Sequence, residues 1–204
     1  MLASIIAVAA SYLLGSVSFS ILIARWVKGI DIRQHGSGNA GATNTLRVLG
    51  KGPAAVVFLL DVAKGIAAVL LGKWLGDGQV WVQVLCGAAA ITGHNWPIWF
   101  RFKGGKGIAT TIGVMATIAF WPALIAGVIA IAAVAVTRYV SLGSLIFVTL
   151  LPVFILVLSM PRALFWASLL IWAYAIIRHR TNIVKLIRGE EHKLGTGKGV
   201  SHGK

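Results

Sequence analysis

A series of long apolar runs, separated by short polar stretches, constrains this chain more than any other feature of its sequence. A helix needs about 20 apolar residues to cross the hydrocarbon core of a bilayer. The runs cover residues 2–23, 53–75, 80–91 (extending toward residue 100), 108–136, 142–160 and 163–177. With 58% hydrophobic and only 12% charged residues, the 204-residue chain is too apolar for a soluble domain, and we expect a polytopic membrane protein.

The run 108–136 is too long for one spanning helix at about 1.5 Å per residue. Proline disrupts a helix interior, so we predict two helices joined by a tight turn at Phe120, Trp121 and Pro122. The total is then seven helices, or five to six if Pro122 only kinks one helix. Lipid offers the backbone no hydrogen-bond partners, which predicts an all-α transmembrane bundle. Residues 1–195 form one membrane domain, and the polar tail 196–204 is expected to be disordered.

The basic residues predict how the chain is oriented. Lysine and arginine number 19 against five acidic residues. With seven helices, nearly all of them fall on one side, and the short loops of the other side receive only Lys73 and Arg162. Basic loops stay in the cytoplasm, so we expect the N-terminus outside and the C-terminus inside. A count of five helices gives the same assignment, whereas a count of six does not. In an apolar chain, this charge favours anionic lipid or phosphorylated substrates over nucleic acid.

Glycine-rich polar segments also gather on the basic side. In residues 34–47, glycines allow backbone N–H groups to turn toward an anion, and Arg47 adds a bidentate donor. The neutral donors of this segment are Ser37, Asn39, Thr43 and Asn44. A solvated loop with a helix cap at Thr43 or Asn44 is an equally good interpretation.

A second segment, 93–107, places Lys103 and Lys106 among three glycines just before a helix, where phosphates bind readily. It is not a Walker A motif, because Phe100 replaces the first glycine and Gly107 follows the lysine. Its aromatic residues are typical of an interfacial belt. They are Trp96, Trp99, Phe100 and Phe102. His94 is interpreted as a structural residue rather than a base.

Two shorter segments, 138–144 and 178–182, complete the set of polar segments on the basic side.

Inside the second apolar run, Asp61 and Lys64 share one helical face, and we interpret them as a mutually neutralising pair that lies deeper than the loops. The sequence has no His-x-x-x-x-Asp motif, no metal-ligand cluster and no Gly-x-Ser-x-Gly elbow with an acidic partner. Cations, hydroxyls and amides remain, which bind phosphate and stabilise an oxyanion.

Together these segments resemble the bacterial membrane family that transfers an acyl group from acyl-phosphate to glycerol-3-phosphate (the PlsY family). The resemblance rests on Gly-Ser-Gly-Asn-Ala-Gly-Ala-Thr-Asn at 36–44, Phe-Leu-Leu-Asp-Val-Ala-Lys-Gly at 58–65, Gly-His-Asn-Trp-Pro at 93–97, Phe-Lys-Gly-Gly-Lys-Gly at 102–107, Arg-Tyr-Val-Ser at 138–141 and Arg-His-Arg-Thr-Asn at 178–182. These blocks occur in the family's order over nearly the whole chain.

The resemblance implies an acyl-phosphate-dependent glycerol-3-phosphate O-acyltransferase of the bacterial inner membrane, making lysophosphatidate in the first step of phospholipid synthesis. It implies a seven-helix fold with a cytoplasmic site and no use of acyl-CoA or acyl carrier protein; we expect no cofactor, no metal and no obligate protein partner. Catalytic roles fall on Arg47, Lys106, His179 and Asn182. Substrate-binding roles fall on Ser37, Gly38, Asn39, Thr43, Asn44, Arg47, Lys106, Ser144 and Asn182. The rival interpretation is a small anion or phosphate transporter, against which the sequence shows no inverted repeat.

Overall fold

The computed structural model describes residues 1–195, so the expectation of a disordered tail falls on residues outside the described part. The described chain folds into nine α-helices and two short 3₁₀-helices with no strand, which confirms the all-α prediction. The α-helices are α1 (Leu2–Gly15), α2 (Phe19–Lys28), α3 (Ala42–Leu49), α4 (Lys51–Leu75), α5 (Val80–Asn95), α6 (Ile108–Ile118), α7 (Phe120–Thr137), α8 (Val140–Val157) and α9 (Arg162–Ile187). The 3₁₀-helices are η1 (Ile32–Gln34) and η2 (Ile98–Phe100).

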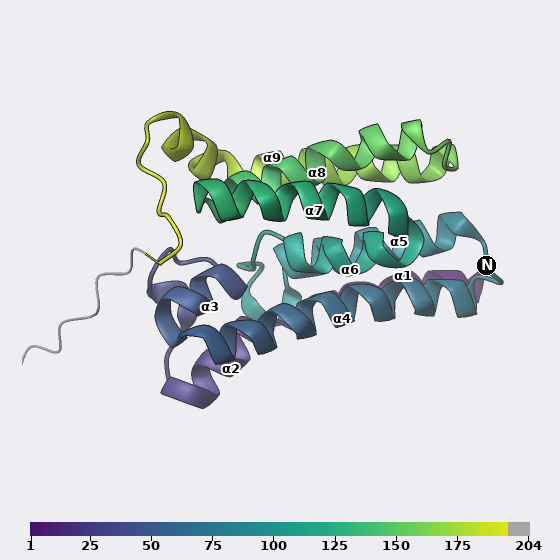
Figure 1. The fold of residues 1–204 in the computed structure, drawn as a ribbon. Coiled ribbons are helices and arrows are strands. Elements are labelled where there is room, and N and C mark those ends of the chain that lie inside the picture. The colour runs from purple at the N-terminus through teal and green to yellow at the C-terminus, as the bar shows by residue number, and fades with distance from the viewer. Residues whose placement is uncertain (196–204) are drawn as a thin grey trace, which may run out of the picture.

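The long helices run side by side along one direction, with the N-terminus at one end and α2, α3 and the C-terminal segment at the other (Figure 1). Small residues let the helices approach closely, as membrane packing requires. A Cβ on Gly65 of α4 would lie 2.4 Å from the Thr110 carbonyl of α6, and one on Gly113 of α6 would lie 2.1 Å from the Val62 carbonyl. These glycines press α4 against α6, and α6 carries one wall of the site described below.

Every apolar run of the sequence is helical over most of its length, and two of the runs are interrupted. The run 108–136 breaks at Ala119, and Pro122 occupies the first turn of α7, where its missing N–H costs no helical hydrogen bond, so the prediction of two helices is confirmed. The run 2–23 is not one continuous helix, because α1 ends at Gly15 and α2 begins at Phe19. The expected loop 34–47 also contains a helix, α3.

Four helices of the described chain are long and apolar enough to cross a membrane by length and composition: 2–28 taken together, α4, α7 and α8. Helix α6 has 11 residues, roughly 16 Å at about 1.5 Å per residue and about half of a bilayer core. Its N-terminus therefore begins within the bundle rather than at its edge. The loop before α6 reaches down to that depth and opens a hollow between the helices.

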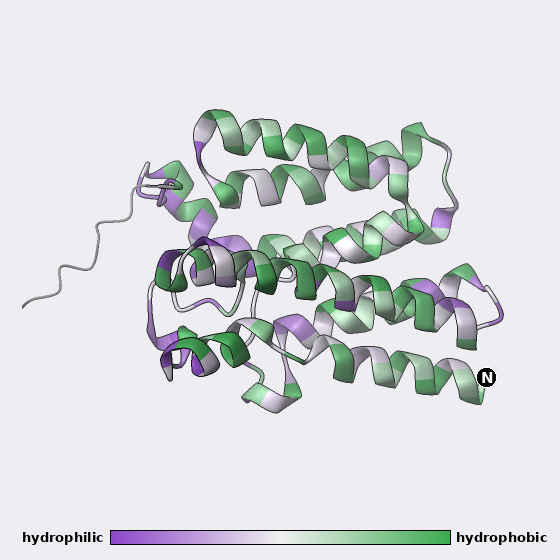
Figure 2. Cartoon of the chain, turned by 60° about the horizontal axis from the view of Figure 1, so that its bottom comes forward, coloured by the Kyte–Doolittle hydropathy of each residue, from purple (hydrophilic) through white to green (hydrophobic). Residues whose placement is uncertain are grey.

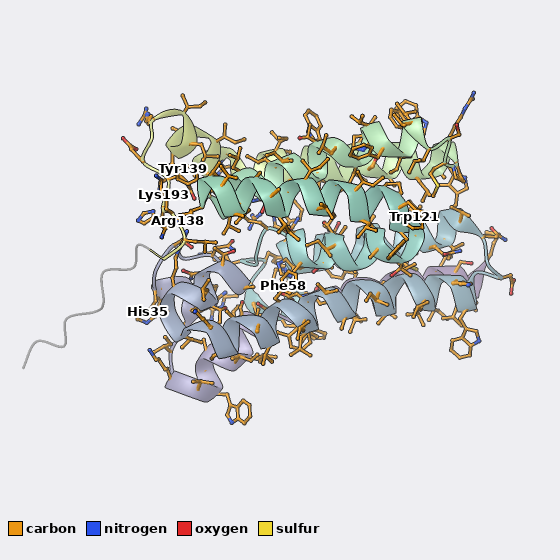
Figure 3. All side chains as sticks on the ribbon, viewed as in Figure 1. His35, Phe58, Trp121, Arg138, Tyr139 and Lys193 are labelled. Atoms are coloured by element: carbon orange, nitrogen blue, oxygen red, sulfur yellow. The ribbon has the colours of Figure 1, made fainter. Side chains whose placement is uncertain are left out.

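The two ends of the bundle differ in polarity, as Figure 2 shows: hydrophilic segments concentrate around α2, α3 and the C-terminal segment, while the helices between the ends are mostly hydrophobic. Exposed tryptophans mark both ends, as in an interfacial belt. Trp26 lies on α2 at the polar end, and Trp121 lies toward the opposite end (Figure 3). Trp96 departs from the predicted belt, because its ring packs edge-on against Tyr174 and beneath Arg178.

Candidate functional site: an anion-binding cavity

A cavity of about 200 Å³ lies between the helices at the polar end, and a wider cavity of about 810 Å³ adjoins it. The two share six lining residues: Ser37, Asn39, Arg47, Lys106, Asn182 and Glu191. Every residue to which the resemblance gives a catalytic or substrate-binding role lines one or both of them: Ser37, Gly38, Asn39, Thr43, Asn44, Arg47, Lys106, Ser144, His179 and Asn182. Segments distant along the chain thus meet at one place, while the roles of the residues remain predictions.

Three helix N-termini converge on the smaller cavity. Its walls include Ala42 and Thr43 of α3, Ile108 and Ala109 of α6, and Val140 of α8. None of these helices has an acidic residue in its first turn. Backbone N–H groups and the positive end of the helix dipole favour an anion at such a position.

Asn44 holds the first glycine loop in shape. Its Nδ2 donates to the carbonyls of Ile32 at 3.1 Å and His35 at 2.9 Å, while its Oδ1 accepts from the Ser37 N–H at 2.8 Å. The loop turns at Gly36 with φ of +61°, and a Cβ there would lie 2.3 Å from Asn44 Oδ1. Since the Asn44 amide already bonds the loop on both sides, its contribution to the cavity is to support Ser37 and Gly38.

The second glycine loop is clamped from two sides. His94 accepts the Gly105 N–H on its carbonyl at 3.1 Å, and a Cβ on Gly105 would lie 2.2 Å from His94 Nε2. Arg178 on α9 donates to the carbonyls of Gly104 and Gly105 at 3.2 and 2.7 Å. Arg178 therefore fixes the backbone next to Lys106.

Lys106, Asn182 and Glu191 form a hydrogen-bonded chain across the cavity. Lys106 Nζ donates to Asn182 Oδ1, and Asn182 Nδ2 donates to the Glu191 carboxylate at 3.0 and 3.1 Å. Burial lowers the pKa of Lys106 from 10.5 to about 8; the positive charges of Arg47, Arg178 and Lys185 act in the same direction, and Glu191 opposes them. The lysine charge is therefore held in place but needs an anion to stabilise it fully.

The sequence did not point to Glu191, which lies beyond every glycine–cation segment. The C-terminal segment carries it back to the cavity, because the Leu194 N–H donates to the Arg138 carbonyl at 2.8 Å and Arg138 Nε donates to the Leu194 carbonyl at 2.9 Å. Figure 3 shows Lys193 close to Arg138 and Tyr139, and its Nζ lies 5.5 Å from the centre of the Tyr139 ring. This pairing brings a carboxylate to the Asn182 amide.

Two hydroxyls of α8 line the cavity, and they differ in whether they have a hydrogen-bond partner. Ser144 Oγ donates to the Val140 carbonyl of its own helix at 2.9 Å. Ser141 also lines the smaller cavity, and its buried Oγ has no hydrogen-bond partner in the described chain. A buried hydroxyl without a partner costs free energy, so Ser141 is a residue that a bound polar group would satisfy, and the sequence had not singled it out.

His179 presents one ring nitrogen to its own helix, with Nδ1 2.8 Å from the Ala175 carbonyl. A carbonyl only accepts hydrogen bonds, so this contact assigns the proton of the neutral ring to Nδ1 and leaves the lone pair on Nε2. His179 is buried on the wall of the smaller cavity. A neutral ring in this state can accept a hydrogen bond from a substrate hydroxyl.

Asp61 and Lys64 form the ion pair that the sequence predicted, with Lys64 Nζ 2.8 Å from Asp61 Oδ1 and both side chains 1% exposed. The pair is not separated from the loops in depth as expected, because Asp61 lines the same cavity as Lys106. The short α6 explains this, since it lets the second glycine loop descend to the level of Asp61. Within residues 1–195, no group of three or more His, Cys, Asp or Glu residues is arranged to hold a metal ion.

Comparisons with known proteins agree with this geometry. Residues 5–189 match the family model described as glycerol-3-phosphate acyltransferase. A glycerol-3-phosphate acyltransferase of Halalkalibacterium halodurans is 55% identical over 193 residues, covering 92% of this chain and 94% of the relative. One from Shouchella clausii is 55% identical over 201 residues, covering 96% and 98%.

The fold matches a crystal structure of PlsY (YgiH), an integral membrane glycerol 3-phosphate acyltransferase, in its glycerol 3-phosphate form. The TM-score is 0.90 at 39% identity, over 95% of this chain and 96% of that one. The lysophosphatidic acid form of PlsY matches with a TM-score of 0.87 over the same shares. A multi-pass helical bundle, a cationic cavity and near-complete sequence coverage lead to one conclusion: the chain belongs to the glycerol-3-phosphate acyltransferase family, with PlsY among its structural relatives.

Proposed function

We propose that the chain transfers an acyl group from acyl-phosphate to the 1-hydroxyl of glycerol-3-phosphate, releasing lysophosphatidate and inorganic phosphate, as the first step of phospholipid synthesis. The observation that carries this proposal is the convergence of three helix N-termini, Arg47 and Lys106 on adjoining cavities. Both substrates are phosphorylated, and two phosphates repel each other unless cations and N–H groups surround them. The forms in which the PlsY structures are described, glycerol 3-phosphate and lysophosphatidic acid, support the same substrate and product.

The acyl carbon of acyl-phosphate is already activated, so the reaction needs no covalent enzyme intermediate. The 1-hydroxyl oxygen attacks this carbon, a C–O ester bond forms, and the anhydride C–O bond breaks with its electron pair leaving on phosphate. Arg47, Lys106 and the glycine-loop amides hold the two phosphates at attack distance, which lowers the barrier mainly through positioning. Asn182, Ser144 and the loop residues that the resemblance implicates orient the polar part of glycerol-3-phosphate.

The acyl chain needs an apolar path into the same cavity. Phe58, Ile108 and Val140 supply apolar surface to the smaller cavity. Phe58 is exposed on α4, on the part of the bundle that we assign to the inner leaflet. In this arrangement seven helices cross the bacterial inner membrane, the N-terminus is outside, and the site opens to the cytoplasm. The donor then enters sideways from lipid while glycerol-3-phosphate enters from water.

The test uses purified protein reconstituted in vesicles with labelled glycerol-3-phosphate and acyl-phosphate. We expect lysophosphatidate to form in step with phosphate release. Lys106→Ala and Arg47→Ala should each lower kcat/KM at least tenfold, since each removes a cation that lines both cavities. Near-normal turnover in both variants would remove these residues from the site, and uptake of label without product would mean that the protein is a transporter.

A second variant identifies the acceptor of the hydroxyl proton. His179→Asn keeps a polar group but lacks the basic Nε2 lone pair. If His179 is the base, kcat should fall by about 10²-fold or more, which is the usual size of a general-base contribution. Turnover above a tenth of wild type would instead assign the proton to a phosphate oxygen of the donor.

A further inference from the structure

Three titratable side chains lie buried beneath the cavity, and the proposed reaction does not use them. Lys64 Nζ lies 2.8 Å from Asp61 Oδ1 and 3.0 Å from His94 Nδ1, and it donates to the Val17 carbonyl at 2.8 Å. All three side chains are at most 5% exposed. Charged groups inside a membrane bundle are costly, so a chain that keeps them has a use for them.

The cluster connects separate elements to the second glycine loop. Val17 lies in the break between α1 and α2, Asp61 and Lys64 lie on α4, and His94 lies at the end of α5. The glycine loop then rests on His94, whose carbonyl accepts the Gly105 N–H. Since Lys106 follows Gly105 directly, any shift of the His94 ring or backbone would move the cation that we assign to phosphate.

The cluster also affects the charge of the cavity. Asp61 and His94 line the smaller cavity together with Lys106. An unpaired carboxylate there would repel a phosphate through a medium of low dielectric constant, where such repulsion is strong. Lys64, which does not line the cavity, neutralises Asp61 from behind.

We propose that Lys64 is a positioning residue of the acyl-transfer site, which neutralises Asp61 in the cavity wall and fixes His94 beneath the loop that carries Lys106. This inference rests on the proposed function, because it concerns the binding of glycerol-3-phosphate there. Lys64 acts through Asp61 and His94 and touches no substrate. If the ion pair were purely structural, replacing Lys64 or Asp61 should affect substrate binding equally. Under this proposal, replacing Lys64 should weaken the binding of glycerol-3-phosphate more than replacing Asp61.

The test compares Lys64→Met, Asp61→Asn and the double variant in purified protein at saturating acyl-phosphate. Lys64→Met leaves a carboxylate facing the phosphates, so we expect its KM for glycerol-3-phosphate to rise at least tenfold, with kcat changed by less than about threefold. Asp61→Asn removes the carboxylate that Lys64 neutralises, and its KM should rise by less than about threefold. The double variant should recover a KM well below that of Lys64→Met.

Thr92→Val is the matched control, because Thr92 lies two residues before His94 and its hydroxyl only bonds the Ala88 carbonyl of its own helix at 2.8 Å. Its KM and kcat should stay at wild-type values. Thermal unfolding in detergent reports on the folding of each variant. If Lys64→Met does not fold, His94→Gln decides the matter, since replacing the rigid ring under Gly105 with a flexible chain should raise KM about tenfold by displacing the loop.

Two results would overturn the proposal. One is equal KM values in folded Lys64→Met and Asp61→Asn, and the other is an unchanged KM in His94→Gln. A wild-type protein that makes no lysophosphatidate would contradict the proposed function instead, so the two failures can be told apart.

Discussion

At the scale of single residues, Lys106 shows how the fold prepares a charge for an anion. Burial and the nearby cations lower its pKa to about 8, while Asn182 Oδ1 accepts a hydrogen bond from its Nζ and Glu191 offsets part of the repulsion. The ammonium is thus less stable here than in water, where its pKa is 10.5. A phosphate that binds beside it restores the lost stabilisation, so part of the binding free energy comes from relieving this cost.

This pKa predicts how substrate binding depends on pH. Below pH 8 Lys106 carries its proton and attracts phosphate; above pH 8 the empty site loses it, so binding must take up a proton. KM for glycerol-3-phosphate should therefore rise by up to about tenfold per pH unit above 8. The substrate phosphate does not complicate this range, because its second pKa is about 6 and it is almost fully ionised by pH 8.

Lys106→Arg is the matched comparison, because a guanidinium stays charged throughout this range. The KM of the variant for glycerol-3-phosphate need not equal that of wild type at pH 7, but it should not change between pH 8 and 9.5. Initial rates at varied glycerol-3-phosphate and saturating acyl-phosphate give both profiles. Parallel profiles for the two proteins would show that another group titrates.

The sequence pointed to Lys106 and Arg47 because cations within glycine-rich segments on one membrane side are rare without an anion to bind. It could not point to Ser141 or Glu191. Ser141 lies one turn before Ser144, and only the packing of α8 decides which hydroxyl lacks a partner. Glu191 reaches Asn182 because Arg138 pairs with Leu194, a contact between residues far apart in the chain that no local pattern indicates.

At the scale of elements, the length of α6 determines how deep the site lies. Its 11 residues leave about half of the bilayer thickness to the loop before it, so glycines 104, 105 and 107 descend among the helices. There the glycine positions of the loop have no room for a side chain. A Cβ on Gly105 would lie 2.2 Å from His94 Nε2 and 2.5 Å from the Ala40 carbonyl, which is closer than real Cβ atoms come to other atoms.

Gly105→Ala should therefore displace the loop and weaken phosphate binding. We expect KM for glycerol-3-phosphate to rise at least tenfold, because a shift of about 1 Å at a positioning element can cost as much as 10²-fold. Gly127→Ala on α7 is the control, since nothing lies within 4 Å of a Cβ there. It should keep wild-type kinetics and unfold at a slightly higher temperature, because alanine favours a helix interior over glycine by about 1 kcal/mol. Equal kinetics in the two variants would contradict the clamp on the loop.

Periodicity and length sufficed to place the helices of the apolar runs, but not the break in the first one. Residues 16–18 are Ser, Val and Ser, which are too short a polar interruption to end an apolar run, and the sequence contains no proline there. The break is stabilised by Lys64, which bonds the Val17 carbonyl from another helix. Helix α3 starts close to the helix cap that the sequence left open at Thr43 or Asn44: its N-cap is Gly41, and the Asn44 bonds tie the helix to the loop before it.

At the scale of the whole molecule, the two ends of the bundle carry different chemistry. The cavities, the glycine loops and most of the basic residues lie at one end. Lys73 in the last turn of α4, Asp77 in the turn that follows and Arg162 at the start of α9 lie at the other end. From this charge asymmetry we propose that the basic end faces the cytoplasm, where glycerol-3-phosphate would reach the site from water and the acyl donor would reach it from the inner leaflet. Orientation and function are thus linked, since the opposite orientation would open the site away from its substrate.

Helix α4 allows this orientation to be measured on a single element. It has 25 residues, so its two ends lie roughly 37 Å apart, on opposite sides of a bilayer. Cys86 is buried and is the one cysteine of the chain, so Cys86→Ala gives a background without reactive thiols. Lys51→Cys at the start of α4 and Gln79→Cys just beyond its end then add exposed thiols outside both cavities.

A membrane-impermeant maleimide should label Gln79→Cys but not Lys51→Cys in intact cells, and the pattern should reverse in inverted inner-membrane vesicles. Lysophosphatidate synthesis by each variant, measured before labelling, confirms that the fold is retained. Because α4 also carries Asp61 and Lys64, the side on which Lys51 lies is the side to which the cavity opens. Labelling of Lys51→Cys in intact cells would place the phosphate site outside the cytoplasm and would leave the enzyme without access to glycerol-3-phosphate.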